Sequence, residues 1–348
     1  MSDLNELIDL KREGAFVYQV AGGRAVFAPD LGARVFCELD GLLLHRLDLE
    51  NVRNPSRPFN NFGGNNFWPA PEGGTFGFNY EGDTWRVQTA INDQPFVMDA
   101  TTGTGARARK ETTLKNRNGA AIDVVMQREF TVVPLPRLVA DLRPRAAFAY
   151  TVDDQIDVMN SVKIDDALVA CWTLEQFDAS DATVSFARVG QPWEAINFDF
   201  YDHPGDRITY ATKGFFYRTD SKKRGQIGVK KGYAPEFIGF CDLQRRLLCV
   251  REIVGTPHGV YFNIADNDQP RGPFSAEDAY SIFNGDDTLG FFELETIGGA
   301  HAQVGYLKGS RLLSRTSFAL LDEAEPIRQF IESAIGIQEA QHGIPAKK

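Results

Sequence analysis

Apolar and polar residues alternate along most of this chain with the period of two that is typical of half-buried β-strands. The alternation predicts strands over residues 25–27, 33–39, 85–89, 107–114, 122–133, 155–164, 168–177, 207–217, 226–229, 237–240, 247–254, 279–283, 289–296, 301–306 and 314–320. Asn118-Gly119 indicates a tight type I′ hairpin, and Lys308-Gly309 and Asn284-Gly285 indicate similar turns. Short strands without helical periods between them predict an all-β fold, a large antiparallel sandwich or barrel.

Helical periodicity is confined to the two ends of the chain. Residues 3–12 repeat apolar positions over three turns, and Pro326 begins a better pattern that Gly336 ends. We therefore expect short peripheral helices at the termini of an otherwise all-β protein. The expected organisation is an N-terminal helical segment over 1–14, a single β-domain over 15–322, a C-terminal helix over 323–337 and a flexible tail over 338–348.

Charge and composition narrow the classes of partner. The net charge of −10 argues against nucleic acid or an anionic membrane as the main partner. No apolar run approaches the roughly 18 residues that span a bilayer, and the first residues lack the apolar core of a signal peptide. We therefore expect a cytoplasmic protein. The four cysteines and five histidines show no metal-ligand spacing, so we expect free buried thiols and no metal.

The segment Gly63–Trp85 combines Gly-Gly turns, prolines and aromatic rings with short hydrogen-bonding side chains. A sugar suits such a loop, because its C–H face packs on a ring while polar groups pair with its hydroxyls. Asn65, Asn66 and Trp68 are the candidate sugar-binding residues of this segment. The alternative is a hairpin loop whose aromatics belong to the core.

Two glutamates, Glu293 and Glu295, lie at positions i and i+2 of a strongly apolar predicted strand. On a strand their side chains point to the same face. Burial and mutual repulsion would then raise at least one pKa, which suits a general acid or base near neutral pH. The alternative is a solvent-facing strand whose alternation puts both glutamates outside and packs Phe292 and Leu294 inward.

Trp172 and Gln176 share one face of the predicted strand 168–177. The pair suits stacking on a ligand ring and hydrogen bonding to its edge, although Trp172 is equally compatible with the core. The basic segment 221–233 includes Lys230 and suits a phosphate or an acidic sugar, with a solvated loop as the alternative.

The aromatic loop and the glutamate strand together resemble the galactose mutarotase (aldose 1-epimerase) superfamily. Residues 72–78, Glu-Gly-Gly-Thr-Phe-Gly-Phe, followed by Trp85, look like the superfamily's His-Gly-Gly-x-x-Gly-Phe loop, with Glu72 in the position of the His. Residues 294–297, Leu-Glu-Thr-Ile, look like the Leu-Glu-Thr-Gln segment that carries the catalytic base. The resemblance implies a β-supersandwich fold, the base role for Glu295 and no cofactor.

The chain departs from the superfamily pattern at three places. Residues 64–68 lack the two arginines of the corresponding segment, and Ile297 replaces a Gln. The general-acid His is missing from its expected interval, where Trp172 and Gln176 stand instead. His258 repeats the letters of that motif much later in the chain and is kept as a candidate lining residue. With these departures, the chain resembles an uncharacterised, divergent branch of the superfamily.

The resemblance implies a mutarotase or related epimerase that acts on the anomeric centre of an aldose or sugar phosphate by acid–base catalysis. Glu295, Glu72 and Glu293 are the candidate catalytic groups. Two alternatives stay open: a non-catalytic carbohydrate-binding or sensing protein, and a lyase or hydrolase on the same scaffold. The expected partner is a small-molecule sugar or sugar phosphate, and the protein is expected to be a monomer or homodimer.

Overall fold

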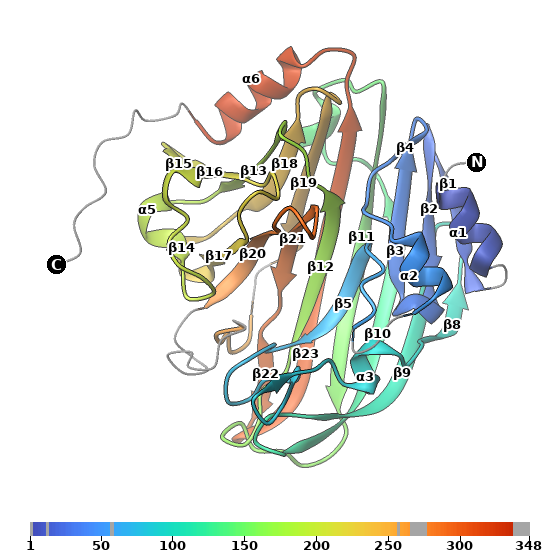
Figure 1. Ribbon diagram of the computed structural model, residues 1–348, viewed down its shortest axis with the longest axis vertical. Helices are drawn as coiled ribbons and strands as arrows, with labels where there is room; N and C mark the ends of the chain where they lie inside the picture. The colour runs from blue at the N-terminus through green and yellow to red at the C-terminus, as the bar shows by residue number, and fades with distance from the viewer. Residues whose placement is uncertain (1–2, 12–13, 56–58, 256–257, 265–276, 337–348) are drawn as a thin grey trace.

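The computed structural model describes residues 3–11, 14–55, 59–255, 258–264 and 277–336 (Figure 1). It is built on two large antiparallel sheets that pack face to face. The predicted tail over 338–348 lies outside the described residues.

One sheet, which we call the site sheet, carries the features that matter below. Its strands run in the order β1 (Phe16–Val20), β2 (Gly23–Ala28), β3 (Arg34–Leu39), β5 (Asn65–Ala70), β12 (Ala170–Asp178), β21 (Phe291–Ile297), β20 (Asp278–Asn284), β17 (Gly225–Lys230) and β14 (Ile196–Asn197), with β4 (Leu42–Leu43) beside β3.

The second sheet, which we call the back sheet, covers the inner face of the first. Its order is β15 (Ile208–Ala211), β16 (Gly214–Arg218), β13 (Thr183–Arg188), β18 (Phe237–Asp242), β19 (Leu247–Ile253), β23 (Tyr306–Leu320), β11 (Ala146–Val158), β10 (Ala121–Val133), β9 (Gly105–Lys115) and β8 (Val97–Thr101), with β22 (Ala300–Gln303) beside β23. A small hairpin pairs β6 (Tyr80–Glu81) with β7 (Thr84–Trp85).

Short helices lie on the outside of the sandwich. They are α1 (Asp3–Lys11), α2 (Leu49–Arg53), α3 (Thr89–Asn92), α4 (Arg137–Ala140), α5 (Pro192–Ala195) and α6 (Glu325–Ala334), with 3-10 turns at Pro29–Leu31, Gly205–Arg207 and Lys231–Tyr233. Helix α6 buries Ile327 and Phe330 on the outer face of the back sheet. Helix α1 buries Leu4 and Leu7 over β2 and β3. Helix α1 therefore covers β2 and β3 but not the outer face of the strands that follow β3 in the sheet, from β5 to β17.

The burial of each strand explains why alternation of apolar and polar residues is clear in some strands and absent from others. Strand β10 alternates buried and less buried positions, as expected for a strand with one face in the core. Strands β12 and β21 are buried on both faces over almost their whole length. A strand buried on both faces reads as a continuous apolar run, which makes the glutamates within it conspicuous.

The all-β sandwich expected from the sequence is confirmed, whereas several local predictions need correction. The segment Gly63–Trp85 is not only a loop, because it contains the central strand β5. The predicted strand 85–89 is cut short, since β7 ends at Trp85 and α3 begins at Thr89. The predicted strand 207–217 is divided into β15 and β16, and 155–164 overlaps only the end of β11.

The predicted turns differ in outcome. A hairpin does form at Asn118-Gly119, but only Gly119 has a positive φ, 86°, so the type I′ geometry is not adopted. Lys308-Gly309 lies inside β23 instead of at a turn. The chain reverses just before it, at Val304 and Gly305, which have φ values of 52° and 77°.

Candidate functional site

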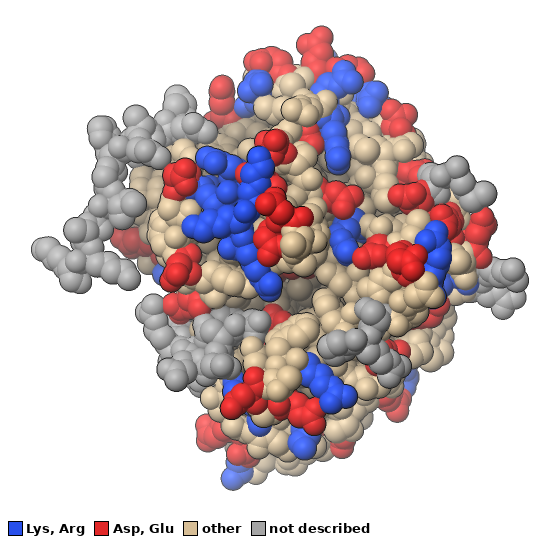
Figure 2. Space-filling model, in the orientation of Figure 1, with Lys and Arg blue, Asp and Glu red and all other residues tan. Residues whose placement is uncertain are grey.

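A cavity of about 430 Å³ opens on the outer face of the site sheet, over β12 and β21. We call it the glutamate cavity. The space-filling view shows this face hollowed near its centre, with basic side chains gathered on one side of the hollow (Figure 2). The lining residues are Phe59, Asn61, Trp68, Glu72, Trp85, Trp172, Leu174, Gln176, Tyr201, Arg224, Gln226, Phe283, Leu289, Phe291, Glu293 and Glu295.

Strand register brings the functional side chains to one face. Gln176 on β12 pairs with Glu293 on β21, and Leu174 pairs with Glu295. Because side chains alternate between the faces of a strand, both glutamates and Gln176 point outward from the sandwich. This outward face is the wall of a cavity, since Glu293 is 7% exposed and Glu295 is 0% exposed. The solvent-facing alternative for the two glutamates is therefore wrong.

Glu295 is held by two side-chain donors, one from the adjacent strand β12 and one from β17, two strands away. Trp172 Nε1 donates a hydrogen bond of 2.9 Å to Glu295 Oε2, and Gln226 Nε2 lies 3.1 Å from each carboxylate oxygen. These hydrogen bonds are too weak to offset the effect of burial on the pKa of the Glu295 carboxyl. Burial, followed by the charge of Glu293, raises the pKa of Glu295 well above its usual value.

Glu293 accepts a hydrogen bond of 2.6 Å from Gln176 Nε2. Arg46 Nη1 in turn donates to Gln176 Oε1 at 3.3 Å, and Arg46 Nη2 donates to Asp48 at 2.8 Å. Burial raises the pKa of Glu293 to about 6, while the Gln176 hydrogen bond and the charges of Arg34 and Arg46 oppose the rise. We call the series Arg46–Gln176–Glu293 the arginine relay.

The two glutamates therefore form a coupled pair in which the pKa of each carboxyl is raised. Burial raises the pKa of Glu293 to about 6 and the pKa of Glu295 well above its usual value, so Glu293 is the first of the two to lose its proton as the pH rises. Interacting carboxyls of this kind titrate together, so the proton belongs to the pair. Two titratable groups whose environments separate their pKa values are characteristic of acid–base catalysis.

Aromatic rings form one wall of the glutamate cavity. The ring of Trp68 lies edge-on to that of Trp172, with centroids 6.3 Å apart, and edge-on to Phe59 at 5.6 Å. Phe59 also meets Trp85 edge-on at 5.6 Å. Such a wall offers apolar faces to the C–H groups of a sugar ring. The polar groups stand beside it, so the cavity matches a ligand with both kinds of surface.

Glu72 reaches the glutamate cavity from the loop that follows β5. Its Oε1 accepts a hydrogen bond of 3.1 Å from Trp85 Nε1, and Asn79 Nδ2 lies at 3.4 Å. Its charge also contributes to the raised pKa of Glu295. Glu72 thus lies near the glutamate pair although it is remote from it in sequence.

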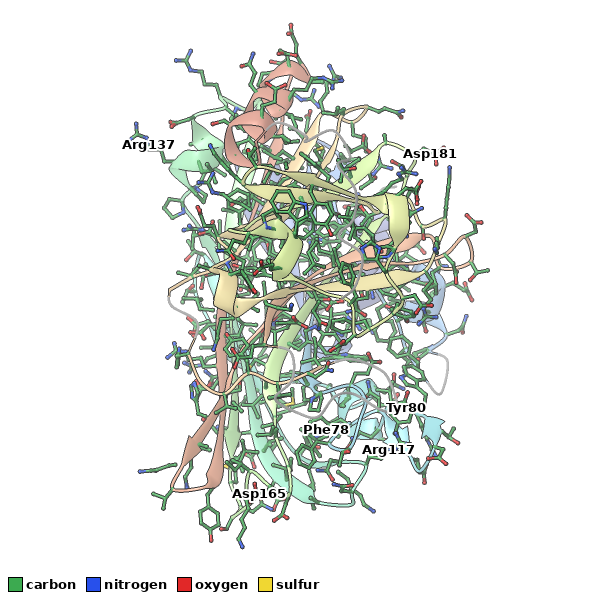
Figure 3. All side chains as sticks on the ribbon, turned by 90° about the vertical axis from the view of Figure 1, so that its left-hand side faces the viewer. Phe78, Tyr80, Arg117, Arg137, Asp165 and Asp181 are labelled. Atoms are coloured by element: carbon green, nitrogen blue, oxygen red, sulfur yellow. The ribbon has the colours of Figure 1, made fainter. Side chains whose placement is uncertain are left out.

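The β9–β10 hairpin anchors the loop that carries Glu72. Arg117 N donates to Gly77 O at 2.9 Å, and the Arg117 guanidinium lies 4.8 Å from the centre of the Tyr80 ring. Figure 3 shows Phe78, Tyr80 and Arg117 grouped at the lower end of the sandwich. The loop is therefore held by backbone and side-chain contacts outside the cavity.

Several lining residues were missed by sequence reasoning, and three of them have polar side chains that matter for the site. Gln226 binds Glu295, while Arg224 and Tyr201 contact each other through a hydrogen bond of 3.0 Å at the edge of the cavity. Arg224 belongs to the predicted basic segment 221–233, so composition did mark its neighbourhood. Gln226 lies in the same segment but carries no charge. Nothing in the sequence marks its role or that of Tyr201, because both roles depend on how distant strands are arranged.

The structure divides the predicted site residues into three groups. Glu72, Glu293, Glu295, Trp68, Trp172 and Gln176 line the glutamate cavity. Asn66 lines a smaller compartment next to it. The other three candidates are Asn65, Lys230 and His258, and the structure does not bring them to the glutamate cavity.

Each of these three side chains has other contacts. Asn65 points into the sandwich, where its Nδ2 donates to Tyr150 Oη at 3.0 Å. Lys230 Nζ donates to Glu194 O at 2.9 Å. His258 stacks on His301 with ring centroids 4.6 Å apart. Alternation along the strand explains Asn65, because its neighbour Asn66 takes the outer face.

A buried polar network lies beneath the site on the inner face of β12. Glu175 is 0% exposed and forms an ion pair with Arg251. Thr316 Oγ1 donates to Glu175 at 2.7 Å, and Tyr150 Oη also donates to it. His45 Nδ1 accepts from Cys37 N, so Nε2 carries the proton and donates to Glu175 at 2.7 Å. Burial opposes ionisation of Glu175, but Arg251 and His45 outweigh it and lower its pKa to about 2.

Two further observations concern metals and membranes. Within the residues that the structure describes, no three His, Cys, Asp or Glu side chains are grouped as metal ligands. The described helices are all too short or too polar to cross a bilayer. The four cysteines are buried free thiols, as expected from their spacing.

Comparison with solved structures identifies similar folds. A putative aldose 1-epimerase from Escherichia coli K12 superposes with a TM-score of 0.51 at 12% identity, covering 88% of this chain and 98% of that one. A galactose mutarotase-like protein from Lactobacillus casei ATCC 334 gives 0.50 at 11% identity, covering 88% and 100%. These likenesses confirm, for the fold, the resemblance inferred from sequence.

Comparison at the level of sequence gives a family but no activity. A search of curated proteins finds no match to the chain. The model of the family DUF6786, described as a family of unknown function, matches residues 47–307. This match spans most of the β-sandwich and includes every residue of the glutamate cavity. The chain therefore belongs to the DUF6786 family and has the galactose mutarotase-like β-sandwich fold.

Proposed function

We propose that this protein is a carbohydrate-active enzyme that interconverts the anomers of a sugar by acid–base catalysis at its anomeric carbon. The observation that supports the proposal is the Glu293–Glu295 pair, two adjacent buried carboxyls whose pKa values are both raised, beside a wall of tryptophans. A non-catalytic sugar-binding protein has no need for two adjacent carboxyls with raised pKa values. The fold is compatible with this chemistry but does not by itself establish it.

The proposed reaction uses the two carboxyls in turn. Glu293 takes the proton of the anomeric hydroxyl while Glu295 gives its proton to the ring oxygen, and the ring opens. After the aldehyde rotates, Glu295 takes the proton back from the open-chain hydroxyl and Glu293 returns its own to the carbonyl oxygen. Proton transfers of this kind each contribute about 10²–10⁴-fold to rate.

This assignment changes the role that the family resemblance implied for Glu295. The resemblance makes Glu295 the base, but a protonated group cannot take a proton in the first step. We therefore assign Glu295 the acid step of ring opening and the base step of ring closure. Glu72 is proposed to hold a sugar hydroxyl, because Trp85 fixes its carboxylate near the pair.

The test is NMR exchange spectroscopy between anomers, with purified protein and a panel of free and phosphorylated hexoses and pentoses. We expect faster exchange for at least one sugar. Glu293→Gln and Glu295→Gln are each expected to slow it by at least about 10²-fold. Glu129→Gln is the matched control, since Glu129 is an exposed glutamate on β10 of the back sheet.

Three results would contradict the proposal. Normal exchange in both cavity variants would place the chemistry elsewhere. Saturation transfer to a sugar without faster exchange would identify a binding protein instead. Release of a smaller sugar from an oligosaccharide, with no anomer exchange of free sugars, would favour a hydrolase or lyase that uses the same carboxyls.

A further inference from the structure

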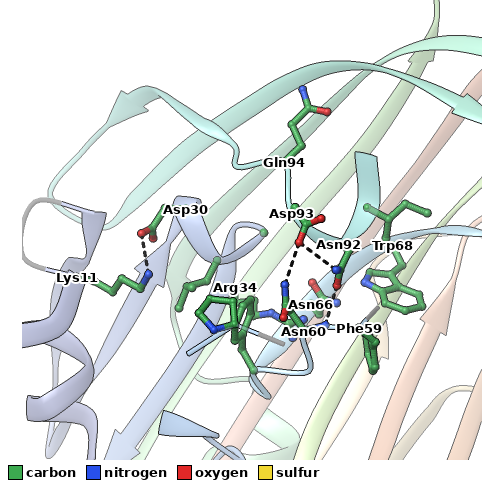
Figure 4. Close-up of a pocket in the computed structure, with 15 residues that line it drawn as sticks. Lys11, Asp30, Arg34, Phe59, Asn60, Asn66, Trp68, Asn92, Asp93 and Gln94 are labelled. Atoms are coloured by element: carbon green, nitrogen blue, oxygen red, sulfur yellow. Dashed lines mark hydrogen bonds and ion pairs between the residues drawn. The ribbon is translucent and has the colours of Figure 1, made fainter. Parts of the chain in front are cut away.

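A second cavity of about 220 Å³ lies next to the glutamate cavity on the same face of the site sheet. We call it the side compartment. Phe59 and Trp68 line both cavities, so a ligand in one lies against the same two rings as a ligand in the other. Four amide side chains also line the compartment, among them Asn60 and Asn66 (Figure 4).

Arg34 is the unusual member of the side compartment. It is 4% exposed, its Nη1 donates to Gly63 O, and its guanidinium lies 5.5 Å from the centre of the Phe62 ring. Its Nε is buried and has no hydrogen-bond acceptor. Burial, together with the charges of Arg46 and Arg128, lowers the pKa of Arg34 to about 9, so it is still charged at neutral pH.

The two arginines near Arg34 each have a carboxylate of their own. Arg46 pairs with Asp48 at 2.8 Å, and Arg128 pairs with Asp154 at 3.0 Å. Glu293 lies near enough for its charge to favour the charged form of Arg34. Within the described ranges, however, no carboxylate forms an ion pair with Arg34, so its guanidinium has no direct counter-ion. A buried charge without a counter-ion is costly, and a protein normally pairs it or neutralises it. An anionic group on a ligand would supply the missing partner.

The other charges of the side compartment limit how much negative charge it accepts. Lys11 and Asp30 pair with each other at 3.2 Å. Asp93 accepts hydrogen bonds from Asn60 Nδ2 and Asn92 Nδ2, each at 3.0 Å. Arg34 offers a single positive charge, so a singly charged group matches it better than a doubly charged phosphate. Asn60 Oδ1 is buried without a donor and is a further acceptor for a hydroxyl of the ligand.

We propose that the natural ligand is an acidic saccharide, with its reducing sugar in the glutamate cavity and its carboxylate in the side compartment against Arg34. The inference rests on the proposed sugar-binding role of the glutamate cavity. The guanidinium binds the carboxylate by charge-assisted hydrogen bonds, and the neighbouring amides bind hydroxyls of the same unit. Trp68, shared by both cavities, packs under the sugar between them.

The experiment measures affinity by titration calorimetry and anomer exchange by NMR for matched ligands. The sets are glucose, glucuronic acid and glucose 6-phosphate; the galactose equivalents; and cellobiose with its uronic-acid counterpart. We expect at least one uronic acid to bind about tenfold or more tighter than its neutral partner, because hydrogen bonds to charged groups are the stronger ones. The same acid should bind more tightly than the matching phosphate.

Variants of Arg34 assign the preference to this side chain. Arg34→Met should bring the acid and neutral affinities to within about twofold of each other, and Arg34→Lys should retain part of the preference because the charge remains. Arg107→Met is the control, since Arg107 is more exposed and lies on the back sheet, paired with Asp99. The comparison of ligands on the unaltered protein stands even if an Arg34 variant fails to fold.

The outcomes separate this inference from the proposed function. Equal affinity for acid and neutral sugars, with faster anomer exchange, overturns the inference and leaves the function. Tighter binding of the phosphate overturns the choice of carboxylate, and an equal loss of preference in Arg107→Met overturns the role of Arg34. Tight binding of a uronic acid without exchange supports the inference and contradicts the function. No binding of any sugar contradicts both.

Discussion

Glu175 and Glu295 lie on adjacent strands of one sheet and are both completely buried, yet burial has opposite outcomes for them. Glu175 faces the inside of the sandwich, where Arg251 and His45 keep its pKa at about 2. Glu295 faces the cavity, where a second glutamate adds to the effect of burial and its pKa rises. The partners, and not the depth of burial, decide whether a buried carboxyl supports the fold or carries a proton for chemistry.

The most direct test of this difference between Glu175 and Glu295 is to make the same substitution at both positions. Glu175→Gln leaves Arg251 as a buried charge without its partner, and we expect a loss of about 3–5 kcal/mol in the free energy of unfolding. Glu295→Gln replaces a carboxyl that is already protonated, so its effect should stay within about 1 kcal/mol. Urea unfolding of both variants measures the difference, and equal losses would show that the two glutamates do not differ as described.

The pH dependence of stability provides a second test of the difference between the two kinds of buried carboxyl. Glu175 has a lowered pKa, so its contribution of about 3 kcal/mol is complete above pH 4.5 and is lost as the pH falls toward 2. Glu293 has a raised pKa, so its effect has the opposite sign. Stability falls by about 2 kcal/mol as the pH rises from 4.5 through 6.

Urea unfolding between pH 3 and 8 tests both limbs of this profile. Asp154 and Asp278 also have pKa values raised by burial, to about 6 and about 7, and add to the falling limb. Glu293→Gln should therefore reduce that limb without abolishing it. An unchanged falling limb in this variant would mean that Glu293 is ionised in the folded protein already at acid pH.

The smallest effect is expected from a substitution in the arginine relay, which should shift the pKa of Glu293. Arg46→Met removes a positive charge that favours ionised Glu293 and releases Gln176 from its donor. The pKa of Glu293 should rise, and the acid midpoint of anomer exchange should move upward by about half a pH unit to one unit. Arg107→Met is again the control. A fall in rate with no shift of the midpoint would reduce Arg46 to a purely structural role.

The fold could be predicted from the sequence because it depends on local alternation, which most strands retain. The facing of Glu293 and Glu295 to one side also followed from the period of a strand. What surrounds them did not follow, because it depends on register between distant segments. Gln226 reaches Glu295 from a strand 69 residues away, and no local pattern records that distance.

The buried polar network around Glu175 could not be predicted from the sequence for the same reason. Glu175 meets His45 and Arg251 across separations of 130 and 76 residues. Strand β5 was hidden inside an apparent loop, because glycines and a proline are unusual around a central strand and the pattern there is that of turns. Lys230 stood out by charge alone, and charge does not tell whether a side chain faces a cavity.

The aromatic wall has a consequence for how occupancy of the cavity can be seen. Three of the four tryptophans, Trp68, Trp85 and Trp172, line the glutamate cavity, while Trp193 lies elsewhere and is 45% exposed. A ligand that enters changes the surroundings of three indoles at once, so the emission of the protein should shift and change in intensity. Arrival of a sugar can therefore be followed by intrinsic fluorescence, without a label and before any reaction is known.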